Sequence, residues 1–319
     1  MSKKNIAIGI LAYNVEKYID LVLQDALSMD VTVLVINDNS SDKTKKIIEK
    51  YNNKKNFYYL ENKQNLGAGS STKLLLKKAK NLGLEFLIKV DGDGQFKKED
   101  IEKIINLYSK ENYDFIKSNR FWENGIEGSI PKQRFFGNLL ATIFFQFSCG
   151  TNKLYDPLNG LFGVKIKILE FLESSRYPKR YGYPFFISVI AVINKFKTFQ
   201  INNTVIYEEH PSNLKALKML FLLIKLSIFF YFKKIIIKQN LGEYQRSAFL
   251  DKWFIFHFLI TLFNLFFLYS DIYYLEITII KTSTLLFLLL FNLIFSIMLF
   301  LFSFSQEIVL RDKYINNEI

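Results

Sequence analysis

The sequence predicts an α/β fold with a mostly parallel sheet and flanking helices, followed by an interfacial helix and two membrane-spanning helices. Two observations support this prediction. Strand-like and helix-like runs alternate up to about residue 120, a spacing typical of a parallel sheet covered by helices. After about Leu217 the composition changes, and two runs of about twenty residues carry almost no charge.

The first part of the chain supplies strands and helices in strict alternation. Each expected strand is a short apolar run, and each expected helix has apolar residues at three- and four-residue spacing. Ser41 or Asp42 is expected at the N-cap of the second helix, and Gly83 at the end of the third. The expected strands are residues 5–13, 31–38, 57–62, 84–91 and 113–121, and the expected helices are residues 15–29, 41–51, 68–83 and 97–112.

The next part of the chain continues this domain and leads to the membrane. A helix is expected over residues 131–150 and a loop over 151–163, then a further helix and a strand over 198–209 that ends the domain near His210. We therefore expect three parts. They are a cytosolic domain over residues 1–212, amphipathic juxtamembrane helices over 213–245, and a two-span anchor with a short cytosolic tail over 246–319.

Two apolar runs near the C-terminus predict the anchor. Trp253–Ser270 and Thr282–Phe304 are each long enough to cross hydrocarbon. A buried core helix is the alternative, but two such runs with one short connection favour a membrane pair. Residues 215–234 are interrupted by Lys225, which favours a helix lying in the interface. Whether this segment crosses the membrane stays open.

The distribution of charge predicts sidedness and partners. Five cations precede the first span, so the positive-inside rule places the large domain and the tail in the cytosol of a multi-pass cell (inner or plasma) membrane protein. The net charge is +12, yet zinc-finger spacing and RNA-binding signatures are absent from the sequence, so membrane lipid is the expected partner and nucleic acid is not. A homo-oligomer is compatible with the sequence. The five cations are Lys233, Lys234, Lys238, Arg246 and Lys252.

Two acids that follow a predicted strand indicate a metal site. Asp91 and Asp93 lie at the carboxyl end of a strand, the edge where ligands bind in parallel sheets, and Asp38 ends a neighbouring strand at the same edge. Side chains at this spacing point to opposite faces of a regular strand, but Gly92 and Gly94 let the backbone turn, so the carboxylates can converge. Such a pair suits Mg2+ or Mn2+, which in turn binds phosphate. A surface turn is the alternative.

The ordered motifs add a family resemblance to this interpretation. "ILAYNVEKY", "VLVINDNSSDKT", "NKQNLGAG", "VDGDGQ" and "SNRF" follow one another at spacings that fit one α/β unit. Over about residues 5–215 the chain resembles the family 2 glycosyltransferases of the GT-A fold, a Rossmann-like architecture. It most resembles their membrane-anchored polyprenyl-phosphate members, the dolichol-phosphate mannose synthase type. The resemblance implies a nucleotide-sugar donor and Mg2+ or Mn2+ as cofactor.

The resemblance also implies a role for individual residues. Asp91 and Asp93 match metal ligands, Arg120 and Arg134 match residues that bind the acceptor phosphate, and Asp156 matches an acid that faces the active site. The implied catalytic residues are Asp91, Asp93 and Asp156. The implied nucleotide-sugar-binding residues are Ala12, Tyr13, Asn14, Glu16, Asp38, Asn65, Gly67, Asp91, Gln95, Ser212 and Lys215.

Some positions depart from the family pattern. Leu11 stands where the family usually has proline, Val15 where it has a second acid, and residues 181–190 lack the acids found in relatives. The arginine usual in the loop near His210 is not evident. "GAGSSTK" is reminiscent of a phosphate loop but lacks the Gly-Lys-Ser/Thr of that motif.

The expected activity is an inverting, metal-dependent transfer of a sugar from a nucleotide-sugar to a polyprenyl (undecaprenyl) phosphate at the cytosolic face of the membrane. Two alternatives stay open. One is transfer to a hydroxyl of a lipid-linked or cell-surface glycan, which needs a general base, for which Asp156 is the candidate. The other is a non-catalytic membrane scaffold.

Overall fold

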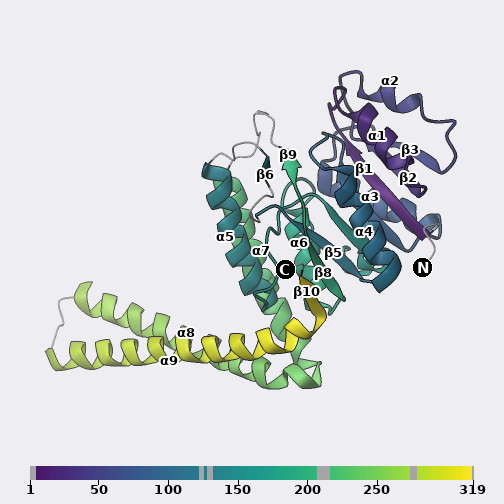
Figure 1. Cartoon of the computed structure of the whole chain (residues 1–319). Coiled ribbons are helices and arrows are strands. Elements are labelled where there is room, and N and C mark those ends of the chain that lie inside the picture. The colour runs from purple at the N-terminus through teal and green to yellow at the C-terminus, as the bar shows by residue number, and fades with distance from the viewer. Residues whose placement is uncertain (1–4, 122–125, 128–131, 207–215, 274–278, 318–319) are drawn as a thin grey trace. The chain divides into compact units, whose positions relative to one another are not determined.

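The computed structural model describes residues 5–121, 126–127, 132–206, 216–273 and 279–317 of the chain (Figure 1). The chain divides into two units. We call Met1–Ile228 with Tyr314–Ile319 the sheet unit, and Phe229–Lys313 the helical unit.

The sheet unit contains an eight-stranded sheet with the order β10-β8-β5-β7-β4-β1-β2-β3. Its strands pair in parallel except β7, which is antiparallel to both β4 and β5. This mostly parallel sheet with flanking helices confirms the predicted fold class. The strands are β1 Ile6–Ala12, β2 Thr32–Asn37, β3 Phe57–Glu61, β4 Phe86–Asp91, β5 Phe115–Asn119, β7 Phe162–Lys165, β8 Thr198–Asn202 and β10 Ile315–Asn317, and β6 Ile126–Glu127 pairs separately with β9 Val205–Ile206.

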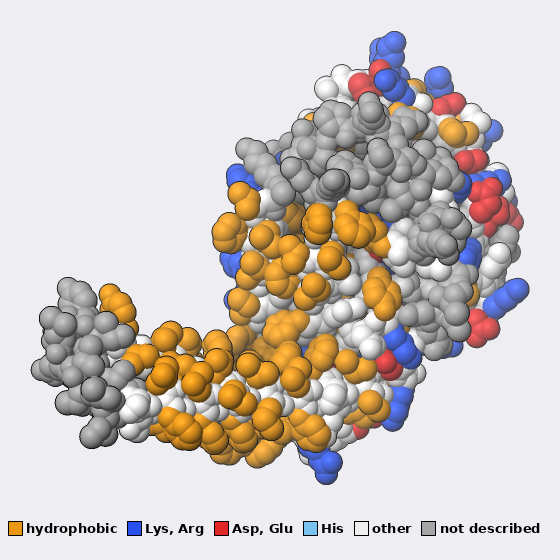
Figure 2. Space-filling model, turned by 60° about the vertical axis from the view of Figure 1, so that its left-hand side comes forward, with side chains coloured by type: hydrophobic (Ala, Val, Ile, Leu, Met, Phe, Trp, Pro, Cys, Tyr) orange, Lys and Arg blue, Asp and Glu red, His pale blue; other side chains and the backbone are white. Residues whose placement is uncertain are grey.

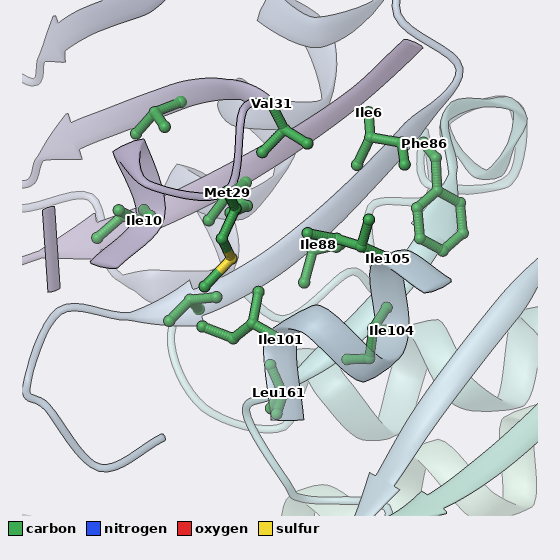
Figure 3. Packing of buried hydrophobic residues seen from close by; sticks show 14 of the residues in the cluster. Ile6, Ile10, Met29, Val31, Phe86, Ile88, Ile101, Ile104, Ile105 and Leu161 are labelled. Carbon is green, nitrogen blue, oxygen red and sulfur yellow. The ribbon is translucent and has the colours of Figure 1, made fainter. Parts of the chain in front are cut away.

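Helices cover both faces of this sheet. Ile8 and Ile10 of β1 belong to a buried cluster with Met29 and with Ile101 and Ile104 of α4 (Figure 3). Between them Gly9 points to the opposite face, where the Leu75 side chain of α3 lies. The helices of the sheet unit are α1 Ile19–Leu27, α2 Thr44–Glu49, α3 Ala68–Asn81, α4 Lys98–Glu111, α5 Lys132–Cys149 and α6 Tyr183–Ile193, with a 3-10 helix over Ile166–Phe171.

Local signals in the sequence account for the helix ends. The N-cap of α2 is Lys43 and not Ser41 or Asp42 as predicted, although the Asp42 carboxylate accepts a hydrogen bond from the Thr44 N–H at 3.0 Å. Gly83 follows α3 with φ +71°, a left-handed conformation that favours glycine.

The helical unit is dominated by two long apolar helices. They are α8 Gln245–Tyr273 and α9 Ile279–Arg311, and they follow α7 Ala216–Gln239, whose second half belongs to this unit. Gly242–Ser270 and Ser283–Tyr314 are long and apolar enough to cross a membrane, and hydrophobic side chains line both (Figure 2). Only 11% of each apolar window is buried inside the protein, as expected of helices whose surroundings are lipid rather than a protein core.

A polar contact joins these two apolar helices. The His257 ring nitrogen Nδ1 lies 2.9 Å from the Asn292 side-chain oxygen, and the Trp253 ring stacks on the histidine at 5.8 Å between centroids. His257 is therefore a hydrogen-bonded residue between α8 and α9.

A second polar feature of the helical unit is a closed set of charges, which we call the ion-pair cluster: Lys234, Lys238, Asp251, Glu307 and Arg311. Glu307 accepts from Lys234 at 3.0 Å, from Lys238 at 2.7 Å and from Arg311 at 2.9 Å. Asp251 accepts from Lys238 at 2.7 Å. All five side chains are 3% exposed or less. Two of the cations that the sequence places beside membrane lipid, Lys234 and Lys238, are thus buried in ion pairs.

Candidate active site

A cleft lies at the carboxyl ends of three neighbouring strands. Ala12 ends β1, Asp38 follows β2, and Asp91 ends β4. Because β1 pairs in parallel with both β2 and β4, these ends meet at one edge of the sheet. Seven of the predicted site residues line the cleft: Ala12, Tyr13, Asp38, Asn65, Gly67, Asp91 and Asp93.

The two acids of the metal motif have different surroundings. The Asp91 carboxylate forms an ion pair with Lys89, which is fully buried and lies 5.5 Å from the centre of the Tyr183 ring. Asp93 accepts a hydrogen bond from the Gln95 N–H at 3.2 Å. Burial, followed by the negative charge of Asp91, raises the pKa of Asp93 to about 6. The pair therefore repels at neutral pH despite the buried lysine.

Three glycines allow this crowded arrangement. A side chain at Gly92 would bring its Cβ within 2.8 Å of the Leu11 carbonyl oxygen, so this position needs close approach to β1. Gly94 turns the chain with φ +75°. Gly160 lies so close to Asp91 that a Cβ there would overlap the carboxylate. Gly160 thus packs against the Asp91 carboxylate, a contact that the sequence did not predict.

The acid pair suits a divalent cation that shares its ligands with a substrate. The described part of the chain has no group of three or more acid, histidine or cysteine side chains arranged to hold a metal. Mg2+ is usually bound by one or two carboxylates together with substrate phosphates. Asp91 and Asp93 fit that donor set, and a cation there would offset both the burial of the Asp93 carboxylate and the neighbouring charge of Asp91, which together raise its pKa.

Asp38 organises a loop of the cleft. Its buried carboxylate accepts hydrogen bonds from the Asn62 side chain at 2.7 Å, from the Leu66 N–H at 2.9 Å and from the Gly67 N–H at 2.8 Å. These contacts hold the residues before α3 in place. Asp38 therefore shapes the cleft as well as lining it.

Asn14 and Glu16 act on a neighbouring loop and do not line the cleft. The Asn14 side-chain oxygen accepts from the Ser41 N–H at 2.8 Å, and the Glu16 carboxylate accepts from the Lys43 N–H at 2.8 Å. The backbone N–H of Asn14 donates to the Ser40 hydroxyl at 3.0 Å. Both residues thus fasten the segment after β2 to the segment after β1.

Asp156 and Arg120 form one buried unit. Arg120 donates through Nε and Nη2 to the two Asp156 oxygens, each at 2.8 Å, and its backbone N–H donates at 3.1 Å. Asp156 is fully buried, and neither residue lines the cleft. Beside them, burial lowers the pKa of Lys117 to about 7, and its ammonium donates to the Asn159 carbonyl at 2.6 Å.

The remaining predicted residues are distributed differently. Gln95 is half-buried and is not part of the cleft lining. Ser212 and Lys215 lie outside the described residues, as does the Arg134 side chain.

Two further cleft residues come from a distant segment. Arg180 and Tyr181, which precede α6, line the cleft with the acids, as does Ser71 of α3. The sequence signal is a basic residue beside tyrosines and a glycine, Gly182, whose φ is +81°. That signal alone does not point to a binding site, so neither Arg180 nor Tyr181 was predicted as a site residue.

A sheet of this topology, with a cleft of acids at its carboxyl edge, is what a nucleotide-sugar-dependent enzyme needs. Residues 7–172 match the glycosyl transferase family 2, and they make up more than half of the chain. The chain belongs to this family, which confirms the predicted resemblance, and it is a glycosyltransferase.

The chain is also similar to individual proteins. It is 27% identical over 224 residues to the UDP-N-acetylglucosamine–dolichyl-phosphate N-acetylglucosaminyltransferase of Methanococcus voltae, covering 66% of this chain and 89% of that protein. It is 31% identical over 129 residues to a poly(ribitol-phosphate) β-N-acetylglucosaminyltransferase of Staphylococcus aureus, covering 39% and 22%. The solved structure of Mycobacterium tuberculosis glucosyl-3-phosphoglycerate synthase superposes with a TM-score of 0.51 at 16% identity, covering 72% and 80%. This likeness concerns the fold alone and agrees with the GT-A architecture.

Proposed function

We propose that this glycosyltransferase transfers a sugar, with inversion, from a nucleotide-sugar to a polyprenyl phosphate at the cytosolic face of a membrane. The observation that carries the choice of acceptor is the buried Arg120–Asp156 pair. A hydroxyl acceptor needs a general base. Asp156, the one base that the sequence offers, is fully buried and has both oxygens engaged by Arg120.

A phosphate acceptor needs no base, because its oxygen is already anionic. It needs a positioned cation, and a guanidinium pairs with phosphate in a forked geometry. In the proposed mechanism the acceptor phosphate binds beside the cleft lining, where Asp156 orients Arg120. Arg120 and Arg134 are its two predicted contacts. The acceptor oxygen then attacks the anomeric carbon on the face opposite the departing nucleoside diphosphate.

The donor is proposed to be a UDP-sugar, with UDP-N-acetylglucosamine the first to test. The two sequence relatives described above, among several, are N-acetylglucosaminyltransferases by name. Asp91 and Asp93 would hold Mg2+ or Mn2+, and the bound ion would offset negative charge on the diphosphate. The two apolar helices support a lipid-linked acceptor, since helices of this length and composition can anchor the chain to a membrane.

A second candidate is transfer to a glycan hydroxyl. The departures at Val15 and over residues 181–190 keep it open, and the Staphylococcus aureus relative acts on poly(ribitol-phosphate) by name. This candidate needs a base other than Asp156.

The test is a transfer assay with the full chain in detergent. UDP-N-acetylglucosamine, UDP-glucose and GDP-mannose are each incubated with Mn2+ or Mg2+, with and without undecaprenyl phosphate, and the lipid is analysed by mass spectrometry. We expect a metal-dependent mass increase of the lipid that is lost in Asp93→Asn. Glu99→Gln, which removes an exposed acid in the same region, is the matched control and should keep activity.

The outcomes separate the candidates. Donor turnover without modification of the lipid phosphate would favour a hydroxyl acceptor. A chain that neither binds nor turns over any of these donors would support the scaffold alternative.

A further inference from the structure

The segment that carries Arg180 is seated firmly on the N-terminus of α3. The Ser70 N–H donates to the Lys179 carbonyl at 2.9 Å, and the Tyr177 hydroxyl donates to the Gly69 carbonyl at 3.0 Å. Gly67 and Gly69 leave no space for a Cβ, because the Arg180 stem and the Pro178 carbonyl occupy it. The two glycines of the motif therefore serve this contact, and the contact places Arg180 in the cleft.

Arg180 differs in charge from the rest of the cleft. Among the described lining residues, Asp38, Asp91 and Asp93 are acidic and Arg180 is the sole lysine or arginine. Its Nη2 donates to the Asn65 carbonyl at 3.3 Å, and no carboxylate in the described part of the chain pairs with it. The side chain is exposed to the cleft, so its guanidinium can meet a ligand.

Two backbone N–H groups at the N-terminus of α3 already have partners within the protein. The Gly67 N–H donates to Asp38, and the Ser70 N–H donates to the Lys179 carbonyl. These two groups, at a helix end of the kind that often binds phosphate, are thus engaged within the protein. Among the described lining residues, Arg180 is the cationic side chain that can add positive charge for a diphosphate beside a bound cation.

We infer that Arg180 is a donor-binding residue that pairs with the diphosphate of the nucleotide-sugar. This inference rests on the proposed function. A divalent cation at Asp91 and Asp93 would neutralise the charge of those two carboxylates. The negative charge of the diphosphate would then still need a further positive group. Arg180 lines the same cleft, and its forked guanidinium suits phosphate oxygens.

Binding of UDP and of uridine to the full chain in detergent tests this role. Arg180→Met keeps the stem that packs on Gly67 and removes the charge. With Mn2+ present, calorimetry should show about 10- to 100-fold weaker binding of UDP, as for a lost charge-assisted hydrogen bond. Affinity for uridine, which has no phosphate, should change by less than about twofold. Arg180→Lys should recover part of the UDP affinity.

Lys179→Met is the matched control, because it removes a neighbouring exposed cation that does not line the cleft. It should bind UDP like the unaltered chain, and all three variants should keep their thermal midpoints without nucleotide. Unchanged UDP affinity in Arg180→Met, or equal losses for UDP and uridine, would overturn the role of Arg180 alone. Failure of the unaltered chain to bind UDP would overturn the proposed UDP-sugar donor, and the inference with it.

Discussion

The two units of the chain bury charge in opposite ways. In the sheet unit, Lys89 pairs with Asp91, while Asp93 beside it forms no ion pair within the described part of the chain and its pKa is raised to about 6. In the helical unit, every member of the ion-pair cluster contacts an opposite charge within 3.0 Å. The first arrangement is open to a cleft and incomplete without a ligand. The second is closed and complete. A buried carboxylate without a cationic partner therefore lies in the candidate active site. The buried charges that are all paired instead hold helices of the helical unit together.

The largest expected effect is in the helical unit. Glu307→Gln leaves Lys234, Lys238 and Arg311 with a single carboxylate, Asp251. Removing one partner of a buried ion pair typically costs about 3–5 kcal/mol, so we expect a clearly lower midpoint of thermal unfolding in detergent. Lys252→Gln, an exposed neighbour of Asp251, should leave the midpoint unchanged. An unaltered midpoint in Glu307→Gln would mean that the cluster contributes nothing to assembly of these helices.

The matching change in the sheet unit should act on activity and not on stability. Asp93→Asn removes a ligand of the proposed cation, whose effect on the transition state is several kcal/mol, so transfer should fall by about a hundredfold or more. The thermal midpoint without metal should stay equal or rise, because the substitution ends the repulsion with Asp91. If Asp93→Asn lowered the thermal midpoint as much as Glu307→Gln, the predicted difference between the acids of the cleft and those of the ion-pair cluster would be wrong.

The stability of the fold should depend on pH because of the buried Lys117. The folded-state pKa of Lys117 is about 7, whereas an unfolded lysine titrates near 10.4. Between these values the unfolded chain binds more protons, so this group makes the free energy of unfolding increase with pH, by up to about 1.4 kcal/mol per pH unit. Urea unfolding followed from pH 7 to 9.5 should show this slope, and Lys117→Met should lack it. The exposed Lys110→Met should retain it.

The smallest expected effect concerns the polar contact between α8 and α9. A double-mutant cycle with His257→Ala and Asn292→Ala should give a coupling of about 0.6 kcal/mol, the average for hydrogen bonds between membrane helices. Thermal unfolding in detergent of the two single variants and the double variant supplies the cycle. A coupling of about 3–5 kcal/mol, the loss expected for Glu307→Gln, would show that this contact stabilises the helical unit as much as the ion-pair cluster does.

Local patterns predicted most of the fold because each element is encoded by its own residues. The strands from β1 to β5 and the helices from α1 to α5 were expected within a few residues of where the structure has them. β7 was not expected as a strand, and the predicted loop over 151–163 overlaps its first two residues; its four residues are strand because they pair between β4 and β5. The strand expected over residues 198–209 is divided into β8 and β9.

In the candidate site, too, residues with a local sequence signal were predicted and residues placed by distant contacts were not. Asp91, Asp93 and Asp38 were found because strand ends and glycine positions are visible locally. The pairing of Arg120 with Asp156 was not predicted, since separate motifs had assigned them separate roles. Lys89 was missed because a lysine inside an apolar strand gives no sign of its partner. Arg180 was missed because a contact with two distant glycines places it.

The short strand β10 has a consequence for how the protein is made. Ile315–Asn317 pairs in parallel with β8 of the same sheet, yet in the chain it follows both long apolar helices. Two paired strands lie on the same side of a membrane. The chain between β8 and β10 must therefore cross a membrane an even number of times, and this conclusion does not depend on the positions of the lysines and arginines. During synthesis, moreover, the ribosome releases α8 and α9 before the residues of β10. The edge of the catalytic sheet is therefore completed only after both long apolar helices have been made.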